Sequence, residues 1–403
     1  MKTGMYASAP ARVYWELTRA CDLACRHCRA EACRERAPDE LTTTECERVL
    51  DALAQAAAPK PHLIFTGGDP LKRPDLVMLV RAAVARGFAV SVAPSATDGL
   101  TGAVVRELKG AGVSAMSLSL DGPSAAHHDA LRGVLGCFGW TLSAGQRIVG
   151  AGIPLQINTL VTADTEPLLE DTVKVVAGLG AARWSLFFLV TVGRGRALTP
   201  VDAVTCERRL RWLAANAERW PFVASTTEAP HYRRVLIQRM RAAGKSTVDI
   251  PTSGRGWGIR DGNGIMFISA DGDVMPSGFL PLAAGNVRQV SPLDVYRDAP
   301  IFRALRTPSL LRGRCGACEF RILCGGSRAR AWAASGDAFG EDPLCGWAET
   351  AALRPGVERD ELLGGESAQD VQARARHELA RDHVHARWRL APAKQAQDRD
   401  RSY

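Results

Sequence analysis

The sequence lacks any long hydrophobic run. No stretch of eighteen consecutive apolar residues occurs in the 403-residue chain, and a membrane-spanning helix needs roughly that length. The N-terminal stretch MKTGMYASAPARVYWELT also lacks the apolar core and cleavage site of a secretion signal. These two absences predict a cytoplasmic protein with no membrane partner.

Aromatic residues and charge blocks are also scarce. Aromatics make up 6% of the chain, and the net charge of +8 is spread out rather than concentrated in basic runs. Nucleic-acid binding surfaces usually combine a basic stripe with aromatics, so no nucleic-acid partner is expected. The excess positive charge suits either an ordinary charged surface or an anionic substrate held by buried arginines.

Cysteine, in contrast, is abundant. A cytosolic chain with eleven cysteines is expected to use them as metal ligands or buried thiols, because disulfides are rare in that compartment. Cys46, Cys137 and Cys206 fall in helical contexts without an obvious partner, which predicts buried thiols. The other eight lie in two groups.

Short apolar runs alternate with amphipathic stretches through the first half of the chain, which predicts an α/β fold with a parallel sheet. The expected strands are 13–18, 62–66, 89–94, 114–120, 154–161 and 183–190. The expected helices are 43–57, 74–86, 100–111, 137–151 and 166–179, with another at 200–218. This order predicts a partial, TIM-like (β/α)6 barrel with its chemistry at the carboxyl ends of the strands.

The later part of the chain is less regular. The barrel is expected over residues 12–220, followed by a linker at 221–258 and a cysteine-rich extension at 259–348. Within the extension, IMFISADGDVMP carries a D-G turn that predicts a β-hairpin. Residues 354–403 are highly charged and predict a helical or disordered tail.

The first cysteine group, CDLACRHC, directly follows the first expected strand. Cys21, Cys25 and Cys28 cannot complete a tetrahedral zinc site without a fourth ligand, and His27 is badly placed to provide one. A [4Fe–4S] cluster held by three thiolates would keep one iron open for a substrate or cofactor. Cys33 is a possible fourth ligand, so an ordinary cluster stays open at this point.

The second expected strand ends in LIFTGGDP. Gly67 and Gly68 allow the backbone to approach a ligand closely, and Asp69 can accept hydrogen bonds from an ammonium group. A lone pair of glycines is a weak signal, but one strand after CxxxCxxC it becomes a strong one.

With these two motifs the chain resembles the radical S-adenosylmethionine (SAM) enzymes. The three cysteines match the family motif CxxxCxφC, with a histidine at the usual aromatic position, and GGD matches the family motif GGE. The resemblance implies that SAM chelates the open iron through its amino and carboxylate groups. Reduction then cleaves SAM to a 5′-deoxyadenosyl radical that abstracts a hydrogen atom from the substrate, so no catalytic side chain is assigned.

The resemblance also implies further SAM-binding positions. Ser119 and Asp121, in SLSLDG, stand where relatives contact the SAM ribose or carboxylate. Asn158 lies at the level of the next strand where polar residues meet SAM, and Leu189 lies where the backbone meets adenine. Ser119 and Asn158 could equally be satisfied polar groups inside a barrel.

The second cysteine group resembles the SPASM extension of radical SAM maturases, which holds two auxiliary clusters. Two positions depart from that pattern, because Ser277 and Arg328 stand where cysteines of one cluster are expected. The resemblance therefore implies a single auxiliary [4Fe–4S] cluster, although the spacing alone would also permit a structural zinc site. Its expected ligands are Cys315, Cys318, Cys324 and Cys345.

The resemblance is strongest to the branch that contains the haem maturases, which modify side chains of anionic tetrapyrroles. It implies propionate decarboxylation, with arginines near the radical and a flavodoxin or ferredoxin as electron donor. Arg183, Arg194, Arg196 and Arg328 are candidate arginines by position.

Two alternatives remain. One is a ribosomal-peptide maturase that forms a thioether, a carbon–carbon link or an epimer on a short peptide. Only a dozen residues precede the first expected strand, so its leader-binding protein would be separate. The other is a non-catalytic iron–sulfur regulatory protein.

Overall fold

The computed structural model describes residues 6–244 and 258–347 of the chain. The chain divides into two compact units, Met1–Leu353 and Arg354–Tyr403. The second unit, with the expected charged tail, lies outside the described residues. No helix in the described part of the first unit is long and apolar enough to cross a membrane.

One twisted sheet forms the centre of the first unit, with the strand order β10-β9-β8-β1-β2-β3-β4-β5-β6-β7. Strands β1 to β7 run parallel, each beside the next. Their bounds are β1 Arg12–Glu16, β2 His62–Thr66, β3 Val90–Val92, β4 Ala115–Ser119, β5 Leu155–Val161, β6 Arg183–Phe188 and β7 Val223–Thr227. The first six confirm the predicted strands to within a few residues at each end.

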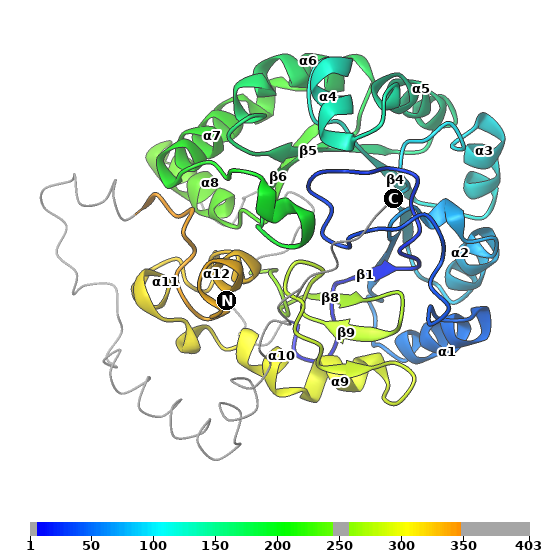
Figure 1. The fold of residues 1–403 in the computed structure, drawn as a ribbon. Coiled ribbons are helices and arrows are strands. Elements are labelled where there is room, and N and C mark those ends of the chain that lie inside the picture. The colour runs from blue at the N-terminus through cyan, green and yellow to red at the C-terminus, as the bar shows by residue number, and fades with distance from the viewer. Residues whose placement is uncertain (1–5, 245–257, 348–403) are drawn as a thin grey trace, which may run out of the picture. The chain divides into compact units, whose positions relative to one another are not determined.

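Helices connect successive strands and lie along the outer side of the sheet (Figure 1). Their bounds are α1 Thr43–Ala54, α2 Leu76–Ala85, α3 Gly102–Gly110, α4 Ala125–Arg132, α5 Cys137–Gly150, α6 Leu169–Gly178, α7 Ala203–Asn216 and α8 His231–Ala242. Local signals explain the beginnings of several. At α1, for example, Thr42 and Glu45 form a capping box, in which each side chain accepts a hydrogen bond from the other residue's backbone N–H.

The prediction of a linker at 221–258 is wrong over much of that range, because residues 223–227 form β7 and residues 231–242 form α8. The sequence conceals α8 because HYRRVLIQRMRA carries four arginines and a weak apolar pattern. One of these, Arg234, is nevertheless buried and paired with the equally buried Glu207 of α7. The short helix α4 was also not predicted.

The sheet continues on the other side of β1 into the expected extension. Strand β8 (Ile265–Ile268) pairs parallel with β1, and β8 and β9 (Asp273–Met275) form the predicted antiparallel hairpin. This pairing places the turn between β8 and β9 beside the carboxyl end of β1. The remaining elements are β10 Gly285–Asn286, α9 Pro292–Asp298, α10 Pro300–Leu305, α11 Gly313–Ala317 and α12 Arg328–Ser335. The division into barrel and extension stays a prediction.

Side chains alternate along each strand between the two faces of the sheet, so one face forms the core and the other lines the cavities. On β2, Leu63 and Phe65 are fully buried in the main hydrophobic core. The intervening residues His62, Ile64 and Thr66 point to the opposite face and line a cavity. The concave face of the sheet therefore surrounds an internal space, and the loops at the carboxyl ends of the strands border it.

Candidate active site

The three cysteines of the first group lie on the loop that follows β1. Cys21 and Cys25 are buried and Cys28 is half-buried. Cys21 and Cys25 share a small apolar cluster with Leu23 and Cys137, and Cys28 packs against it. The structure thus confirms that Cys137 is buried, and it also places this thiol beside the cysteine loop.

Each of the three sulfurs accepts one hydrogen bond from an N–H group. The donors are the Leu23 amide to Cys21 Sγ at 3.4 Å, the Ala32 amide to Cys28 Sγ at 3.5 Å, and the Arg132 guanidinium to Cys25 Sγ at 3.6 Å. Hydrogen bonds of this kind stabilise a thiolate, the form of sulfur that binds iron, although burial raises the pKa of the Cys21 thiol.

Cys33 takes a different position. Its backbone N–H donates to the carbonyl of Arg19 at 3.3 Å, and its carbonyl accepts from the N–H of Cys21 at 2.7 Å. Its exposed thiol instead donates to the carbonyl of Glu35 at 3.1 Å. The backbone of Cys33 therefore closes the cysteine loop, while its thiol is not grouped with the other three.

The two glycines of GGD allow β2 to approach the start of the cysteine loop. A Cβ atom on Gly67 would lie 2.3 Å from the carbonyl oxygen of Thr18, and one on Gly68 would lie 2.4 Å from that of Ala20. Both contacts are too short for any side chain. The close approach permits hydrogen bonds from Gly68 N to Thr18 O (2.8 Å) and from Asp69 N to Ala20 O (2.7 Å).

Asp69 is buried, and it organises the backbone at this junction. Its Oδ1 accepts hydrogen bonds from the amides of Leu71 (3.1 Å) and Ser95 (3.3 Å). Burial raises the pKa of Asp69 to about 6. Ser95, which the sequence did not indicate, links the two motifs, because its hydroxyl lies 3.2 Å from Cys21 Sγ and donates to the carbonyl of Gly68 at 3.0 Å.

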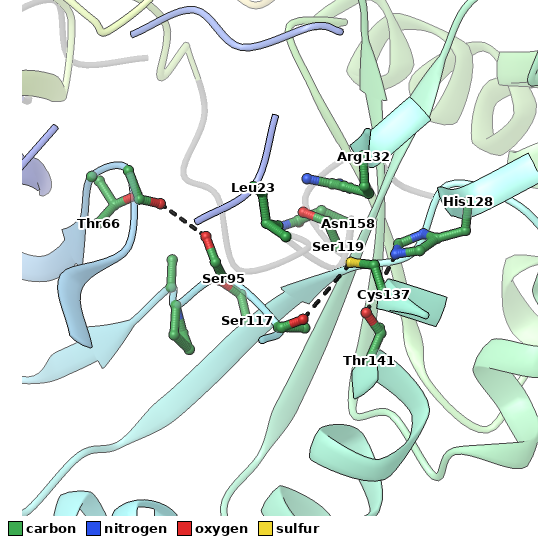
Figure 2. A pocket seen from close by; sticks show the side chains of 15 residues that line it. Leu23, Thr66, Ser95, Ser117, Ser119, His128, Arg132, Cys137, Thr141 and Asn158 are labelled. Atoms are coloured by element: carbon green, nitrogen blue, oxygen red, sulfur yellow. Dashed lines mark hydrogen bonds between the residues drawn. The ribbon is translucent and has the colours of Figure 1, made fainter. Parts of the chain in front are cut away.

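A cavity of about 200 Å³ lies against this junction (Figure 2). Four of the residues predicted to bind SAM line it: Gly67, Gly68, Ser119 and Asn158. Asn158 Oδ1 accepts a hydrogen bond from the side chain of Gln156 at 2.7 Å. Asp69 and Leu189 are not among the lining residues, so their direct contact with SAM stays a prediction.

Arg132 is the main cavity residue that sequence reasoning missed. It lines the cavity, donates to Cys25 Sγ and forms a buried ion pair with Asp121. Asp121 in turn accepts the amide of Leu160 at 2.7 Å, and the pKa of its carboxyl is lowered by the Arg132 charge although burial opposes this. Asp121 therefore positions Arg132, and Arg132 places a positive charge between the cavity and the cysteines.

Leu189 follows β6 and is buried in a small apolar cluster. Its carbonyl accepts a hydrogen bond from Arg330 of α12 at 3.3 Å. The backbone that was predicted to meet adenine is therefore attached to the cysteine-rich part of the chain.

Comparison with known proteins assigns this arrangement to a family. The radical SAM superfamily profile matches residues 15–176. The AdoMet-dependent heme synthase of Oleidesulfovibrio alaskensis is 40% identical over 341 residues, covering 83% of this chain and 86% of that protein. The chain belongs to the radical SAM superfamily.

Two further similarities fit this assignment. The PqqA peptide cyclase of Granulibacter bethesdensis is 27% identical, covering 95% of this chain and 96% of that protein. Streptococcus suis SuiB bound to S-adenosylmethionine shares the fold, with a TM-score of 0.66, 18% identity, and coverage of 84% of this chain and 77% of that one.

As a radical SAM enzyme, the protein uses a [4Fe–4S] cluster and SAM and requires a reductant. The three hydrogen-bonded sulfurs and the adjoining polar cavity fit these two cofactors. The alternative of a non-catalytic regulatory protein is wrong, because the family and its relatives are enzymes.

A second, larger cavity of about 540 Å³ adjoins the smaller one. The two have four lining residues in common: Thr66, Ala93, Ser117 and Asn158. The larger cavity extends along the concave face of the sheet toward β7 and β8. A ligand bound in the larger cavity would lie next to one bound in the smaller cavity.

The larger cavity combines positive charge with aromatic surface. Its arginines are Arg12, Arg29, Arg183, Arg233 and Arg260, and its phenylalanines are Phe187, Phe267 and Phe279. The Arg29 guanidinium lies 4.4 Å from the centre of the Phe267 ring and forms a 2.8 Å ion pair with the buried Glu16. A flat apolar ligand with several carboxylates matches this lining.

Of the four arginines proposed from sequence, only Arg183 lines this cavity. Arg194 and Arg196 lie on a 3₁₀ helix, Gly193–Ala197, and do not line it. The assignment of Arg328 is wrong. Its fully buried guanidinium donates to the carbonyls of Ala338 and Gly340, at 3.1 and 2.7 Å, and to Cys315 Sγ at 3.6 Å.

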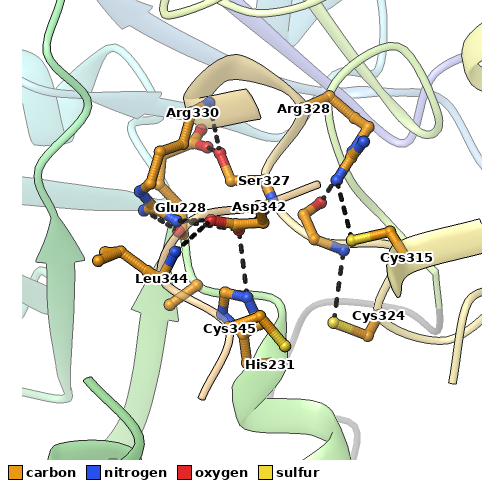
Figure 3. Close-up of polar contacts among 12 residues, drawn as sticks. Glu228, His231, Cys315, Cys324, Ser327, Arg328, Arg330, Asp342, Leu344 and Cys345 are labelled. Carbon is orange, nitrogen blue, oxygen red and sulfur yellow. Dashed lines mark hydrogen bonds and ion pairs between the residues drawn. The ribbon is translucent and has the colours of Figure 1, made fainter. Parts of the chain in front are cut away.

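The four cysteines of the second group come together around α11 (Figure 3 shows three of them). Cys315 and Cys324 are buried, and Cys318 and Cys345 are half-buried. Burial, together with the nearby thiols of Cys345 and Cys315, raises the pKa of Cys324 to about 12. The Cys318 and Cys324 sulfurs each accept a backbone N–H at 3.4 Å.

A single zinc ion would require its sulfur ligands to converge on one point, at about 2.3 Å from the metal. Within residues 6–244 and 258–347, no three His, Cys, Asp or Glu side chains converge in this way, at either cysteine group. The geometry therefore does not distinguish a zinc ion from an iron–sulfur cluster.

Ser277 is the other residue that departs from the SPASM pattern. Ser277 lines the larger cavity, and its hydroxyl accepts the N–H of Phe279 at 3.3 Å. Gly326 and Ser327, which follow Cys324, line the same cavity. Only a few residues along the chain therefore separate Cys324 from the wall of the larger cavity.

Proposed function

We propose that the protein modifies a tetrapyrrole and converts propionate side chains of a haem precursor to vinyl groups. The observation that carries this proposal is the larger cavity, whose aromatic surface suits a flat macrocycle and whose arginines suit its carboxylates. Its volume, about 540 Å³, lies within the range of cavities that enclose ligands of several hundred daltons. The heme synthase relative, 40% identical over most of both chains, supports the same substrate class.

The site's own residues would bind and orient. Cys21, Cys25 and Cys28 would hold the catalytic cluster, and the cavity around Gly68 and Arg132 would hold SAM. With both held there, the site would gain a 5′-deoxyadenosyl radical able to remove a hydrogen atom from the substrate. Removal from the carbon β to a propionate carboxylate, followed by loss of carbon dioxide and one electron, leaves a vinyl group.

The second cysteine group would hold one auxiliary [4Fe–4S] cluster. Four cysteine thiols are present, and hydrogen bonds reach three of their sulfurs. Such a cluster would supply an acceptor for the electron that decarboxylation releases. A flavodoxin or ferredoxin in the cytoplasm would supply the reducing electrons.

A turnover experiment tests the proposal. Reconstituted protein is incubated without oxygen with SAM, a reductant and an iron porphyrin that bears four propionates. We expect 5′-deoxyadenosine together with porphyrin products that have lost carbon dioxide and two hydrogen atoms per modified side chain. An unchanged porphyrin, with active cofactors, would refute the tetrapyrrole assignment.

Peptide maturation is the second candidate, because the PqqA peptide cyclase relative covers almost the whole chain. The larger cavity also contains two acidic residues, Glu228 and Asp261, which a peptide side chain or amide could contact. Production of 5′-deoxyadenosine with a short peptide but not with the porphyrin would favour this alternative.

A further inference from the structure

Glu228 is an unusual residue in the wall of the larger cavity. It directly follows β7, and its φ angle of 55° places it in the left-handed region. Among the described non-glycine residues, only Glu31 shares this feature. For a residue other than glycine, this backbone conformation typically costs about 1–2 kcal/mol of free energy, and it persists where surrounding contacts hold the backbone in place.

Those contacts come from the segment between Cys324 and Cys345 (Figure 3). Arg330 donates to the backbone carbonyl of Glu228 and forms a buried ion pair with Asp342 at 3.0 Å. Asp342 also accepts the amide of Ser327 at 2.7 Å, and the Ser327 hydroxyl donates to Glu228 Oε2 at 2.5 Å. The backbone and one carboxyl oxygen of Glu228 are therefore fixed.

The second carboxyl oxygen, Oε1, accepts no hydrogen bond from residues 6–244 or 258–347. Oε2 already accepts a hydrogen bond from the Ser327 hydroxyl. When the Glu228 carboxyl group is protonated, its proton therefore lies on Oε1. The charged groups around the side chain are Asp261, Asp342 and Arg330. Burial, together with the two aspartates, raises the pKa of Glu228 to about 8, although Arg330 and the Ser327 hydrogen bond oppose this.

We propose that Glu228 is a substrate-binding residue whose carboxylic acid O–H donates a hydrogen bond to a carboxylate of the bound substrate. This inference rests on the proposed tetrapyrrole function and adds a specific contact to it. The arginines of the cavity supply fixed positive charges, whereas Glu228 supplies a neutral donor on the β7 side. A hydrogen bond of this kind, between an acid and a carboxylate, is among the stronger ones in proteins.

The test is a binding titration across pH, without reductant or SAM. The iron porphyrin with four propionates is titrated into the reconstituted protein, and the shift of its main absorption band gives Kd between pH 7 and 9.5. The variants are Glu228→Gln, which keeps a donor, and Glu228→Ala, which does not. Glu218→Gln, at an exposed position outside the cavity, is the matched control.

The parent and the control should bind more weakly above pH 8, with Kd rising by up to about tenfold per pH unit, because the ionised carboxylate repels the ligand. Glu228→Gln should bind within about threefold of the parent at pH 7 and lose this pH dependence. Glu228→Ala should raise Kd by roughly 10- to 100-fold at pH 7. Iron content and melting temperature show whether each variant has folded.

Two results would overturn the inference. Folded Glu228→Gln with the parent's pH profile would show that another group titrates, and folded Glu228→Ala with the parent's Kd would show that the contact is not made. In both cases the tetrapyrrole function would stand. A parent protein that binds no porphyrin at any pH would instead overturn the proposed function and this inference together.

Discussion

Replacing Gly68 by alanine tests the packing that joins the GGD motif to the cysteine loop. The new Cβ would lie 2.4 Å from the carbonyl oxygen of Ala20 and 2.6 Å from that of Arg19. Ordinary carbon–oxygen contacts begin at about 3.3 Å, so β2 and the cysteine loop must separate by about 1 Å. Both contacts are with backbone atoms, which cannot rotate away as a flexible side chain would.

The expected cost follows from this geometry. Overpacking of this kind costs about 1–3 kcal/mol, and the separation also stretches the backbone hydrogen bonds from Gly68 to Thr18 and from Asp69 to Ala20. If the loss falls on the bound state, SAM affinity should drop roughly 10- to 100-fold. Gly150→Ala is the matched control, because a Cβ there meets no atom within 4 Å at the end of α5.

Two assays read the outcome. Calorimetric titration of reconstituted protein gives the Kd for SAM, and iron analysis should show a loss of up to about four atoms per chain in Gly68→Ala. Gly150→Ala should match the parent in both and be slightly more stable, since alanine favours a helix over glycine by about 0.5–1 kcal/mol. Full iron content and parental SAM affinity in Gly68→Ala would refute the close-packing argument.

Three further predictions concern other parts of the site. Arg132→Gln leaves the buried carboxylate of Asp121 without its cation, so the free energy of unfolding measured in urea should fall by about 3–5 kcal/mol. A fall below about 1 kcal/mol would mean that the ion pair contributes little to stability. Cys345→Ser should remove about four iron atoms per chain, whereas Cys33→Ala should remove none, and loss of iron from the Cys33 variant would contradict the position of its thiol. Arg183→Ala should raise KM for the porphyrin about tenfold, because Arg183 lines the larger cavity. Arg196→Ala, outside the cavity, should leave KM unchanged. Equal effects of the two substitutions on KM would argue against the larger cavity as the substrate site.

The parts of the site that sequence could predict are those whose chemistry demands one residue type at one spacing. Iron ligation demands thiols, so the spacing of Cys21, Cys25 and Cys28 already marked them as candidate ligands, and the structure places all three on the loop after β1. A close backbone approach demands glycine, so Gly67 and Gly68 were as well. The first six strands were predictable for a related reason, because parallel strands buried by helices are marked by short apolar runs.

The parts that could not be predicted depend on contacts between distant segments. Arg132 is one arginine among many until the fold brings it to Cys25 and Asp121. Helix α8 was read as a linker because the sequence does not show that Glu207 would pair with the buried Arg234. Arg328 was misplaced for the same reason, since only the fold shows that its guanidinium is enclosed by carbonyl groups near Cys315.

The most direct test of the central claim follows one hydrogen atom. The porphyrin is prepared with deuterium on the carbon β to each propionate carboxylate and incubated with the reconstituted enzyme, SAM and reductant. The account predicts deuterium in the 5′-deoxyadenosine and a vinyl group that retains one deuterium at the attacked carbon. Vinyl product accompanied by 5′-deoxyadenosine free of deuterium, or no vinyl product, would contradict it.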